Sequence, residues 1–260
     1  MADNNEMLTF GGHLEVLRKM LFRILGVAGG IAFLVFCFKD TTFMLLFAPS
    51  EYDFCTYRWI ENVIRGMGVD FHFAPYHVDL IATDLSSQFM THITTSCYLG
   101  LLGASPFIMY ELFRFVSPAL YENERKYSVL VVSAIYALFV IGVLMSYYIL
   151  FPISFRFLGT YSVAERVHST ITLDSYIETF STLTLVMGMV FQLPIIAFVL
   201  SKIGFIDSDM LCQYRKHALL IIAVVAAIIT PPDLMTLILV TIPLYLLYEA
   251  SIRIVKWVEE

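Results

Sequence analysis

The chain has 260 residues, of which 59% are hydrophobic and only 15% are charged, and its formal net charge is −6 at pH 7. Soluble domains are closer to half apolar and a quarter charged, so this composition excludes an ordinary soluble protein. The mean hydropathy of +0.78 is typical of an integral membrane protein.

Six apolar segments are predicted to be helices, and together they form one polytopic membrane domain over residues 1–260. They cover residues 20–38, 89–113, 127–151, 176–200, 218–230 and 234–249. The first reaches roughly 28 Å at 1.5 Å per residue, which is enough to span a bilayer. It lacks the small-residue cleavage site of a signal peptide, so we expect it to be retained. The expected fold class is an all-α integral membrane protein with six transmembrane helices.

The long connection after the first helix, about residues 41–88, is predicted to carry structure of its own. Ile60, Val63, Ile64 and Met67 follow the i, i+3, i+4, i+7 spacing of one helical face. We therefore expect a short amphipathic helix that lies on the outer membrane surface.

Hydroxyl side chains are frequent in the second and fourth segments, where they bond the helix backbone or a neighbouring helix, or line a polar groove. They are Thr91, Thr94, Thr95, Ser96, Thr179, Ser181, Thr182 and Thr184. Gln192 in the fourth segment is taken as the most polar residue inside any helix. Two cysteines, Cys37 and Cys97, are expected to be buried as small apolar residues.

The fifth and sixth segments are shorter than an ordinary span. They reach about 20 Å and about 24 Å, whereas the hydrocarbon core is roughly 30 Å thick. The turn between them, Thr230-Pro231-Pro232-Asp233, ends one helix and offers Asp233 as the N-cap of the next. This hairpin is predicted either to thin the bilayer locally or to be a re-entrant pair that does not cross.

Basic residues predict the orientation of the chain. With the N-terminus inside, eleven of them face the cytoplasm: Arg18, Lys19, Arg23, Arg114, Arg125, Lys126, Lys202, Arg215, Lys216, Arg253 and Lys256. Only five lie in the opposite loops: Lys39, Arg58, Arg65, Arg156 and Arg166. The positive-inside rule therefore places both termini in the cytoplasm, an N-in, C-in topology.

Signatures of covalent catalysis are missing from the sequence. It contains no HExxH, GxSxG or GxxxxGK[ST] pattern. The six histidines are scattered, and the four cysteines have neither CxxC spacing nor histidine partners at metal-ligand spacing. We therefore expect neither an enzyme nor a bound metal or cofactor, and nothing indicates nucleic-acid binding.

Four motifs stand on the predicted cytoplasmic parts of the chain. They are His13-Leu14-Glu15-Val16-Leu17-Arg18-Lys19, Phe115-Val116-Ser117-Pro118-Ala119-Leu120-Tyr121-Glu122-Asn123-Glu124-Arg125, Phe191-Gln192-Leu193-Pro194 and Thr230-Pro231-Pro232-Asp233. In order and spacing they resemble the motifs of the TatC family, the multispanning core and receptor subunits of the twin-arginine protein translocase. The match covers nearly the whole chain except a longer first outer loop.

The resemblance implies a function. TatC proteins bind the twin-arginine motif of signal peptides on folded precursors, through the N-terminal tail and first cytoplasmic loop. They assemble with small single-span subunits of the TatA and TatB type and with further copies of themselves. The expected location is the bacterial cytoplasmic membrane, with energy from the proton-motive force. The alternative is a polytopic small-molecule transporter, but the chain shows no internal repeat and its central polar residue is neutral.

Glu124 is the best candidate to receive a guanidinium, because paired carboxylate–Arg hydrogen bonds are strong and geometrically selective. By itself Glu124 is better explained as a solvated carboxylate paired with Arg125 or Lys126, and only the resemblance to the family reverses this preference. The same motif, by resemblance, adds Phe115, Tyr121 and Pro118 to the site.

The entry motif departs from the family, because Val16 stands where relatives carry a second glutamate. Glu15 and Arg18 are candidates for the site, although they lie three apart on one helical face and can pair with each other. Glu15 is one replacement for the missing acid, and Glu111 or Glu122 are others.

Further positions match the family. On chemical grounds alone, Gln192 forms an interhelical hydrogen bond or has a role in transport. Many relatives carry Glu at this position. Gln keeps the hydrogen bond but cannot titrate, so we expect no proton relay through it. Pro49 and Phe115 also match, and on chemical grounds alone each is equally consistent with packing or a rigid turn.

Overall fold

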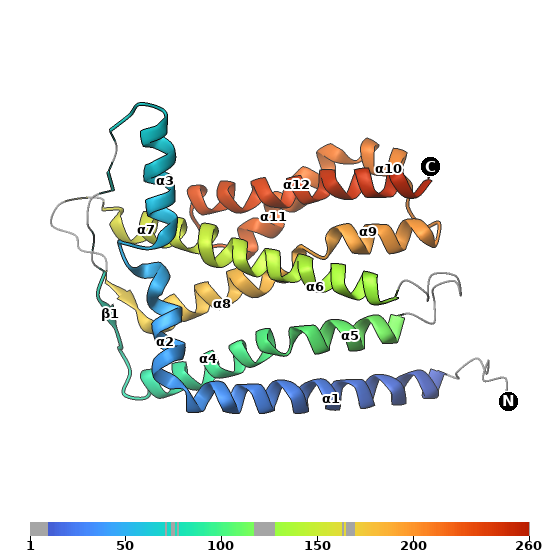
Figure 1. Cartoon of the computed structure of the whole chain (residues 1–260), viewed down its shortest axis with the longest axis horizontal. Coiled ribbons are helices and arrows are strands. Elements are labelled where there is room, and N and C mark those ends of the chain that lie inside the picture. Colours follow the sequence, from blue (N-terminus) through green and yellow to red (C-terminus); the bar gives the residue numbers. More distant parts are fainter. Residues whose placement is uncertain are drawn as a thin grey trace. The chain divides into compact units, whose positions relative to one another are not determined.

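The computed structural model describes residues 10–70, 72–73, 76, 78–116, 128–162, 164 and 170–259, and most of them are helical (Figure 1). The elements in chain order are α1 (Phe10–Cys37), α2 (Lys39–Phe47), η1 (Ala48–Ser50), α3 (Cys55–Gly66), β1 (Leu80–Ile81), α4 (Ser87–Gly103), α5 (Ser105–Val116), α6 (Ser128–Met145), η4 (Ser146–Leu150), α7 (Phe151–Thr160), β2 (Ile171–Thr172), α8 (Leu173–Val190), α9 (Leu193–Lys202), α10 (Ser208–Gln213), α11 (Arg215–Ile229) and α12 (Leu234–Glu259). The two short strands pair in parallel.

The chain packs into two units. Unit 1 consists of the described residues of Met1–Phe38 and Ile93–Tyr136, and unit 2 of those of Lys39–His92 and Ala137–Glu260. Unit 1 therefore contains α1, α5 and most of α4. Unit 2 contains α2, α3 and all elements from η4 onward, and the boundary passes through α4 and α6.

Four helical stretches among the described residues are long and apolar enough to cross a membrane. They are Leu14–Cys37, Val132–Thr160, Leu173–Lys202 and Leu234–Glu259. The α4–α5 stretch is interrupted at Ala104, and α11 has only 15 residues. The short fifth helix is thus as predicted, whereas a count of six spans stays a prediction.

The predicted short sixth helix is wrong. Helix α12 has 26 residues and continues past Glu249 to Glu259. Ser251, Ile252 and Val255 carry its buried face onward while Arg253 and Lys256 are exposed. The predicted segment ends at Glu249 because the hydropathy of the sequence falls at these charged residues. A helix with one buried apolar face, however, continues where its other face becomes charged. The hairpin of two short helices is therefore not present.

Prolines explain the interruptions of the long segments, because a proline inside a helix removes a backbone donor and pushes against the preceding turn. Pro106 follows the break at Ala104, and Pro194 follows the break between α8 and α9. Pro152 stands just after the π-turn η4, so the third segment does not end at Phe151 as predicted but continues to Thr160. Pro243 lies inside α12.

Unit 1 is held together by a close approach of α1 and α4. A Cβ atom added to Gly100 would lie 2.8 Å from the Ala28 carbonyl oxygen and 2.6 Å from the Ala32 Cβ. Small residues at such a crossing let two backbones pack without a side chain between them. On the outside of α1, Phe22, Leu25 and Phe33 are exposed, as expected of a surface that faces lipid tails.

The core of unit 2 is aromatic. Phe151 lies edge-on to Tyr176 and Phe180, with ring centroids 5.0 Å and 4.9 Å away, and the Tyr176 hydroxyl donates to the Leu46 carbonyl at 2.8 Å. Such edge-to-face pairs add to the free energy of burial. They join α7 and α8 to the end of α2.

Some of the hydroxyls in the second and fourth segments serve packing in unit 2, one of the two predicted roles. Ser87 and Thr91 of α4 donate to the Asp174 carboxylate of α8 at 2.6 Å and 2.5 Å. The buried Thr184 hydroxyl donates to the Phe180 carbonyl at 2.8 Å, one turn earlier in its own helix. These bonds satisfy polar groups where water is scarce.

The amphipathic helix predicted in the first long connection is present as α3, whereas its position on the outer membrane surface stays a prediction. Thr56 donates to the Tyr148 carbonyl, and Tyr57 donates to the Pro152 carbonyl at 2.7 Å, so the start of α3 is fixed against η4 and α7. Burial raises the pKa of the Tyr57 hydroxyl. The apolar residues that predicted this helix stay at least partly exposed: the exposed fraction is 39% for Val63 and 76% for Met67.

Arg156 of α7 also contributes to the contact between α3 and α7. The Arg156 guanidinium lies 5.0, 4.3 and 4.5 Å from the ring centroids of Tyr57, Phe73 and Tyr76. Each cation–π contact contributes about 0.5–2 kcal/mol, depending on how far it is desolvated. We call this arrangement the Arg156 cage.

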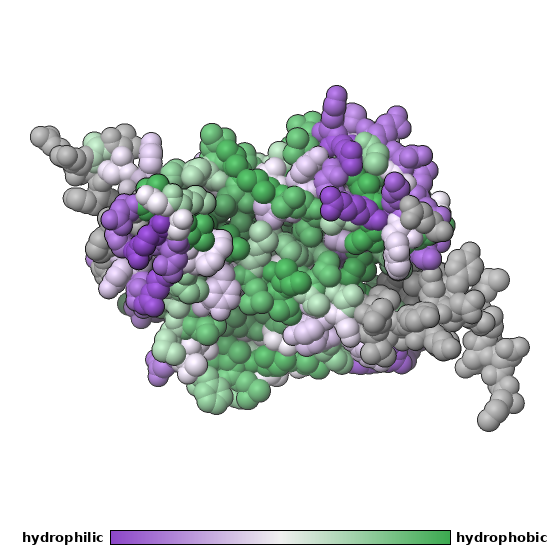
Figure 2. All heavy atoms as spheres, turned by 45° about the horizontal axis from the view of Figure 1, so that its top comes forward, coloured by the Kyte–Doolittle hydropathy of each residue, from purple (hydrophilic) through white to green (hydrophobic). Residues whose placement is uncertain are grey.

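The surface of unit 2 has the polarity of a membrane protein. Figure 2 shows hydrophilic residues gathered over α3 and over α10 with the end of α12, and hydrophobic residues between them. Ile238, Ile242 and Leu246 of α12 are among the exposed apolar residues of unit 2. The expectation that Cys37 and Cys97 are buried is wrong, since both are exposed. An apolar side chain of a membrane helix can face lipid as readily as the protein core.

Candidate functional site

The N-terminal half of α1 and the C-terminal half of α5 enclose a small cleft within unit 1. Its volume is about 220 Å³. Its lining residues are Val16, Lys19, Met20, Arg23, Glu111, Arg114 and Phe115, and we call it the basic cleft. Two of the positions singled out in the family motifs, Val16 and Phe115, therefore face the same space.

The centre of the basic cleft is an ion pair between residues 88 positions apart. Arg23 Nη1 donates to Glu111 Oε1 at 3.1 Å and to Oε2 at 3.3 Å. Glu111 is only 5% exposed, whereas about half of the Arg23 side chain is exposed. A buried carboxylate without a partner is strongly unfavourable, so Glu111 keeps Arg23 against α5. The sequence predicted Glu111 as a possible acid of the site, but it did not predict Arg23 as the partner of Glu111.

On the exposed side of α1, Glu15 pairs with Lys19 at 2.8 Å, one turn away. The anticipated pairing of Glu15 with Arg18 is therefore not the contact that forms, and Arg18 is exposed. Both side chains are largely exposed, so this pair contributes little to stability. Glu15 consequently remains accessible to a ligand.

The structure brings Glu15, Arg18 and Phe115 to one end of unit 1, at the start of α1 and the end of α5. Glu124, Tyr121, Pro118 and the alternative acid Glu122 lie outside the described residues. In the sequence they follow directly after α5, so the described residues supply the base of the expected site.

Gln192 lies, half-buried, at the break between α8 and α9. Its side-chain amide donates to the Gly188 carbonyl at 3.5 Å, a long bond to the preceding turn. Pro194 removes the donor that would continue the helix, which accounts for the break at this position.

Two structural motif residues have the expected roles. Asp233 caps α12, as predicted, because its Oδ1 accepts a hydrogen bond from the Thr236 backbone N–H at 2.7 Å. Pro49 is buried in η1, where the Ser50 hydroxyl donates to the Phe47 carbonyl at 2.7 Å. Both residues shape turns between helices.

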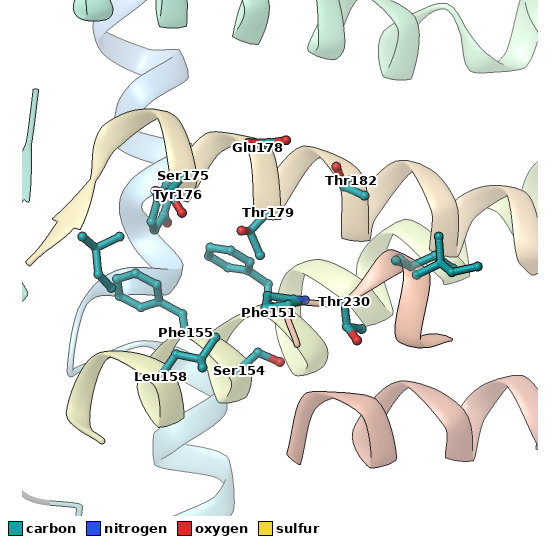
Figure 3. A pocket seen from close by; sticks show the side chains of 14 residues that line it. Phe151, Ser154, Phe155, Leu158, Ser175, Tyr176, Glu178, Thr179, Thr182 and Thr230 are labelled. Carbon is teal, nitrogen blue, oxygen red and sulfur yellow. The ribbon is translucent and has the colours of Figure 1, made fainter. Parts of the chain in front are cut away.

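A second hollow, in unit 2, lies between α7, α8 and the end of α11, and its volume is about 420 Å³ (Figure 3). Its hydroxyl groups come from Ser154, Ser175, Tyr176, Thr179, Thr182 and Thr230. The Ser154 hydroxyl is buried and has no hydrogen-bond partner among the residues that the structure describes. The predicted polar groove of the fourth segment is therefore real for Thr179 and Thr182, whereas Thr184 serves packing.

Glu178 also lines this hollow, and the sequence reasoning missed it. It is exposed, and it stands in the first half of the apolar helix α8. The statement that Gln192 is the most polar residue inside any helix is therefore wrong. A charged residue within an apolar run was the signal that should have identified Glu178.

Metal ligation finds no support in the part of the chain that the structure describes, where no three His, Cys, Asp or Glu side chains are grouped to hold an ion.

Known proteins of one family match this chain along nearly its whole length. The family described as "Sec-independent protein translocase protein (TatC)" matches residues 12–243. The protein of that name from Blattabacterium sp. subsp. Periplaneta americana is 33% identical over 99% of this chain and 98% of its own. TatCy from Bacillus subtilis is 37% identical over 68% of this chain and 70% of its own.

A solved structure is similar as well. The crystal structure titled as the twin-arginine translocase receptor TatC superposes with a TM-score of 0.75 at 30% identity. The superposition covers 95% of this chain and 100% of the chain in that crystal structure.

Proposed function

The chain belongs to the TatC family of Sec-independent protein translocase subunits, and from this premise we propose that it recognises the twin-arginine signal peptides of folded precursors. The fold is that of a helical membrane protein with several apolar spans. The alternative of a small-molecule transporter is not supported by any of the relatives. TatC is a family of transport proteins, and no catalytic activity is indicated for it.

The observation that carries the proposal is the meeting of Glu15, Arg18 and Phe115 at one end of unit 1, directly before the segment with Glu124. Three cations and one carboxylate line the basic cleft itself, and two further arginines would be repelled from it. The twin arginines therefore need carboxylates outside the cleft. Glu124 is the principal acceptor, Tyr121 and Phe115 provide apolar contact, and Glu15 is the accessory acid.

A binding experiment tests this function. The purified protein is incubated with a folded precursor that carries Arg-Arg in its signal peptide, and with the same precursor carrying Lys-Lys. Lysine keeps the charge but loses the planar pair of donors, so retention of the Lys-Lys precursor should be clearly weaker. Equal retention of the two precursors would contradict the proposed recognition.

The proposed orientation has both termini in the cytoplasm, with six spans in the bacterial cytoplasmic membrane. The eleven-to-five distribution of basic residues supports it. The amphipathic α3 then lies on the outer surface, and the basic cleft lies at the cytoplasmic side. Small single-span Tat subunits and further copies of the chain are the proposed assembly partners.

The orientation predicts the reactivity of two exposed cysteines, Cys55 at the start of α3 and Cys212 in α10. In intact cells an impermeant thiol reagent should label Cys55, and it should label Cys212 only after permeabilisation. Two single-cysteine variants are compared, one that keeps only Cys55 and one that keeps only Cys212, with the other three cysteines replaced by Ser, so that each signal has one source. Labelling of Cys212 in sealed cells would reverse the orientation.

A further inference from the structure

Two charged residues and three phenylalanine rings line a hollow of unit 2 that the proposed receptor site does not use. The hollow lies between α2, β1 and the start of α4, and its volume is about 570 Å³. It shares no lining residue with the basic cleft or with the hydroxyl-lined hollow. We call it the Lys39 hollow, after the first residue of α2. A cavity of this volume is within the usual range for small-molecule sites.

The two charges of the Lys39 hollow have opposite signs. Lys39 and Asp40 are adjacent at the start of α2, and both side chains are exposed. Neighbouring positions of a helix do not face each other. Neither side chain forms a hydrogen bond or an ion pair with another residue that the structure describes. The hollow therefore offers one cation and one anion to a ligand.

Two apolar helices place the Lys39 hollow at a membrane boundary. The candidate span of α1 ends at Cys37, two residues before Lys39, and the candidate span of α8 begins at Leu173, which lines the hollow. Hydrocarbon gives way to headgroups and water at the ends of such spans. A lysine at this level extends its ammonium group toward the headgroups. The hollow therefore lies at the level of lipid headgroups, whichever side of the membrane it faces.

The apolar wall of the Lys39 hollow is built from packed rings. The centroid of the Phe43 ring lies 5.5 Å from that of Phe47 and 5.6 Å from that of His92, so the rings join α2 to α4. Phe89 of α4 is 58% exposed and adds apolar surface at the edge of the hollow. Contacts within the protein thus shape this wall before a ligand arrives, which lowers the ordering cost of binding.

We propose that the Lys39 hollow binds the headgroup of a phosphatidylethanolamine molecule. The Lys39 ammonium donates to the phosphate, and the Asp40 carboxylate accepts from the primary ammonium of the lipid. Hydrogen bonds between charged groups are stronger than neutral ones, and each group of the lipid meets a partner of opposite sign. The glycerol unit and the first acyl carbons lie against Phe43 and Phe89.

Asp40 distinguishes this lipid from two other headgroups. The quaternary ammonium of phosphatidylcholine has no N–H to donate to a carboxylate. Phosphatidylglycerol carries no cation, so its phosphate would contact Lys39 but would meet Asp40 as a charge of the same sign. Both lipids should therefore bind more weakly than phosphatidylethanolamine.

The test uses the full chain in a neutral detergent, with the dihexanoyl forms of the three lipids as probes. Binding is followed by native mass spectrometry and by the increase in unfolding temperature. The parent should bind phosphatidylethanolamine about tenfold more tightly than either other lipid, a difference of about 1.4 kcal/mol. The double variant Lys39→Gln/Asp40→Asn should bind all three lipids alike.

Single variants separate the two contacts. Asp40→Asn keeps Lys39 for the phosphate, so it should lose the preference for phosphatidylethanolamine and bind phosphatidylglycerol more tightly than the parent does. Lys39→Gln should weaken the binding of all three lipids, because each of them carries the phosphate. The matched control is Asp53→Asn/Arg58→Gln, which removes one charge of each sign from an exposed pair at α3 and should keep the preference of the parent.

Three outcomes would overturn the proposal: a parent without preference among the lipids, a double variant that keeps the preference, or an Asp40→Asn variant with unchanged affinity for phosphatidylglycerol. Soluble O-phosphoethanolamine is the last probe. If it stabilises the parent as much as the lipid does, the hollow is a site for a free zwitterion and the proposal of a lipid site is wrong. None of these variants should change the binding of a twin-arginine precursor, because Lys39 and Asp40 lie outside the proposed receptor site.

Discussion

Replacing Glu124 by Gln should weaken the binding of a twin-arginine precursor by about one to two decades. A hydrogen bond to a charged group contributes about 1.5–3 kcal/mol, and each decade of affinity corresponds to about 1.4 kcal/mol. The variant keeps the size and the hydrogen-bonding capacity of the side chain but offers the guanidinium a neutral acceptor. The loss is measured as the dissociation constant of a precursor from the purified protein.

The control for Glu124→Gln is Glu15→Gln. Glu15 is already paired with Lys19 at 2.8 Å, so its loss should weaken binding less. An equal loss of affinity would mean that Glu15 has replaced the glutamate that relatives carry at the position of Val16. Both variants should accumulate in the membrane like the parent, because Gln has nearly the same size as Glu and still forms hydrogen bonds. Parent-like binding by Glu124→Gln would show that the proposed receptor site is wrong.

Replacing Gly142 by Ala should destabilise unit 2 by about 1–3 kcal/mol, the usual cost of an overfilled core. The added Cβ would lie 2.6 Å from the Met187 carbonyl oxygen and 2.9 Å from Phe191 Cγ. The first of these is a backbone atom, so relief requires α6 and α8 to separate. The unfolding temperature in detergent and the amount in the membrane should both fall.

The matched control for Gly142→Ala is Gly26→Ala in α1. A Cβ at Gly26 meets nothing within 4 Å, so only the better helix propensity of alanine acts there, about 1 kcal/mol in favour of the helix. The two substitutions should therefore have opposite signs. Equal unfolding temperatures of Gly142→Ala and the parent would show that α6 and α8 are not in close contact.

The positions of the helices were largely predictable, but several of their ends were not. Hydropathy finds the apolar middle of a helix, whereas its ends depend on which face is buried. Helix α12 continues to Glu259 because Val255 is buried while Lys256 points away. The third segment extends through Pro152 because of the π-turn η4, and no local sequence pattern predicted this turn.

The chemistry of the candidate site was less predictable than the fold. The pair of Arg23 and Glu111 joins positions 88 apart, and only the packing of α1 against α5 brings them together. Glu15 had two basic neighbours within one turn, and the choice of Lys19 over Arg18 depends on side-chain geometry. Asp233 was recognised as a cap because that signal lies within four consecutive residues.

The Arg156 cage has a mechanical consequence for a protein that handles folded cargo. Sliding α7 by one helical turn, about 5.4 Å, would withdraw the guanidinium from all three rings at once, since they lie 4.3–5.0 Å away. Axial displacement of α7 would therefore break all three cation–π contacts together, so the Arg156 cage opposes such a displacement and ties α7 to α3 through Tyr57.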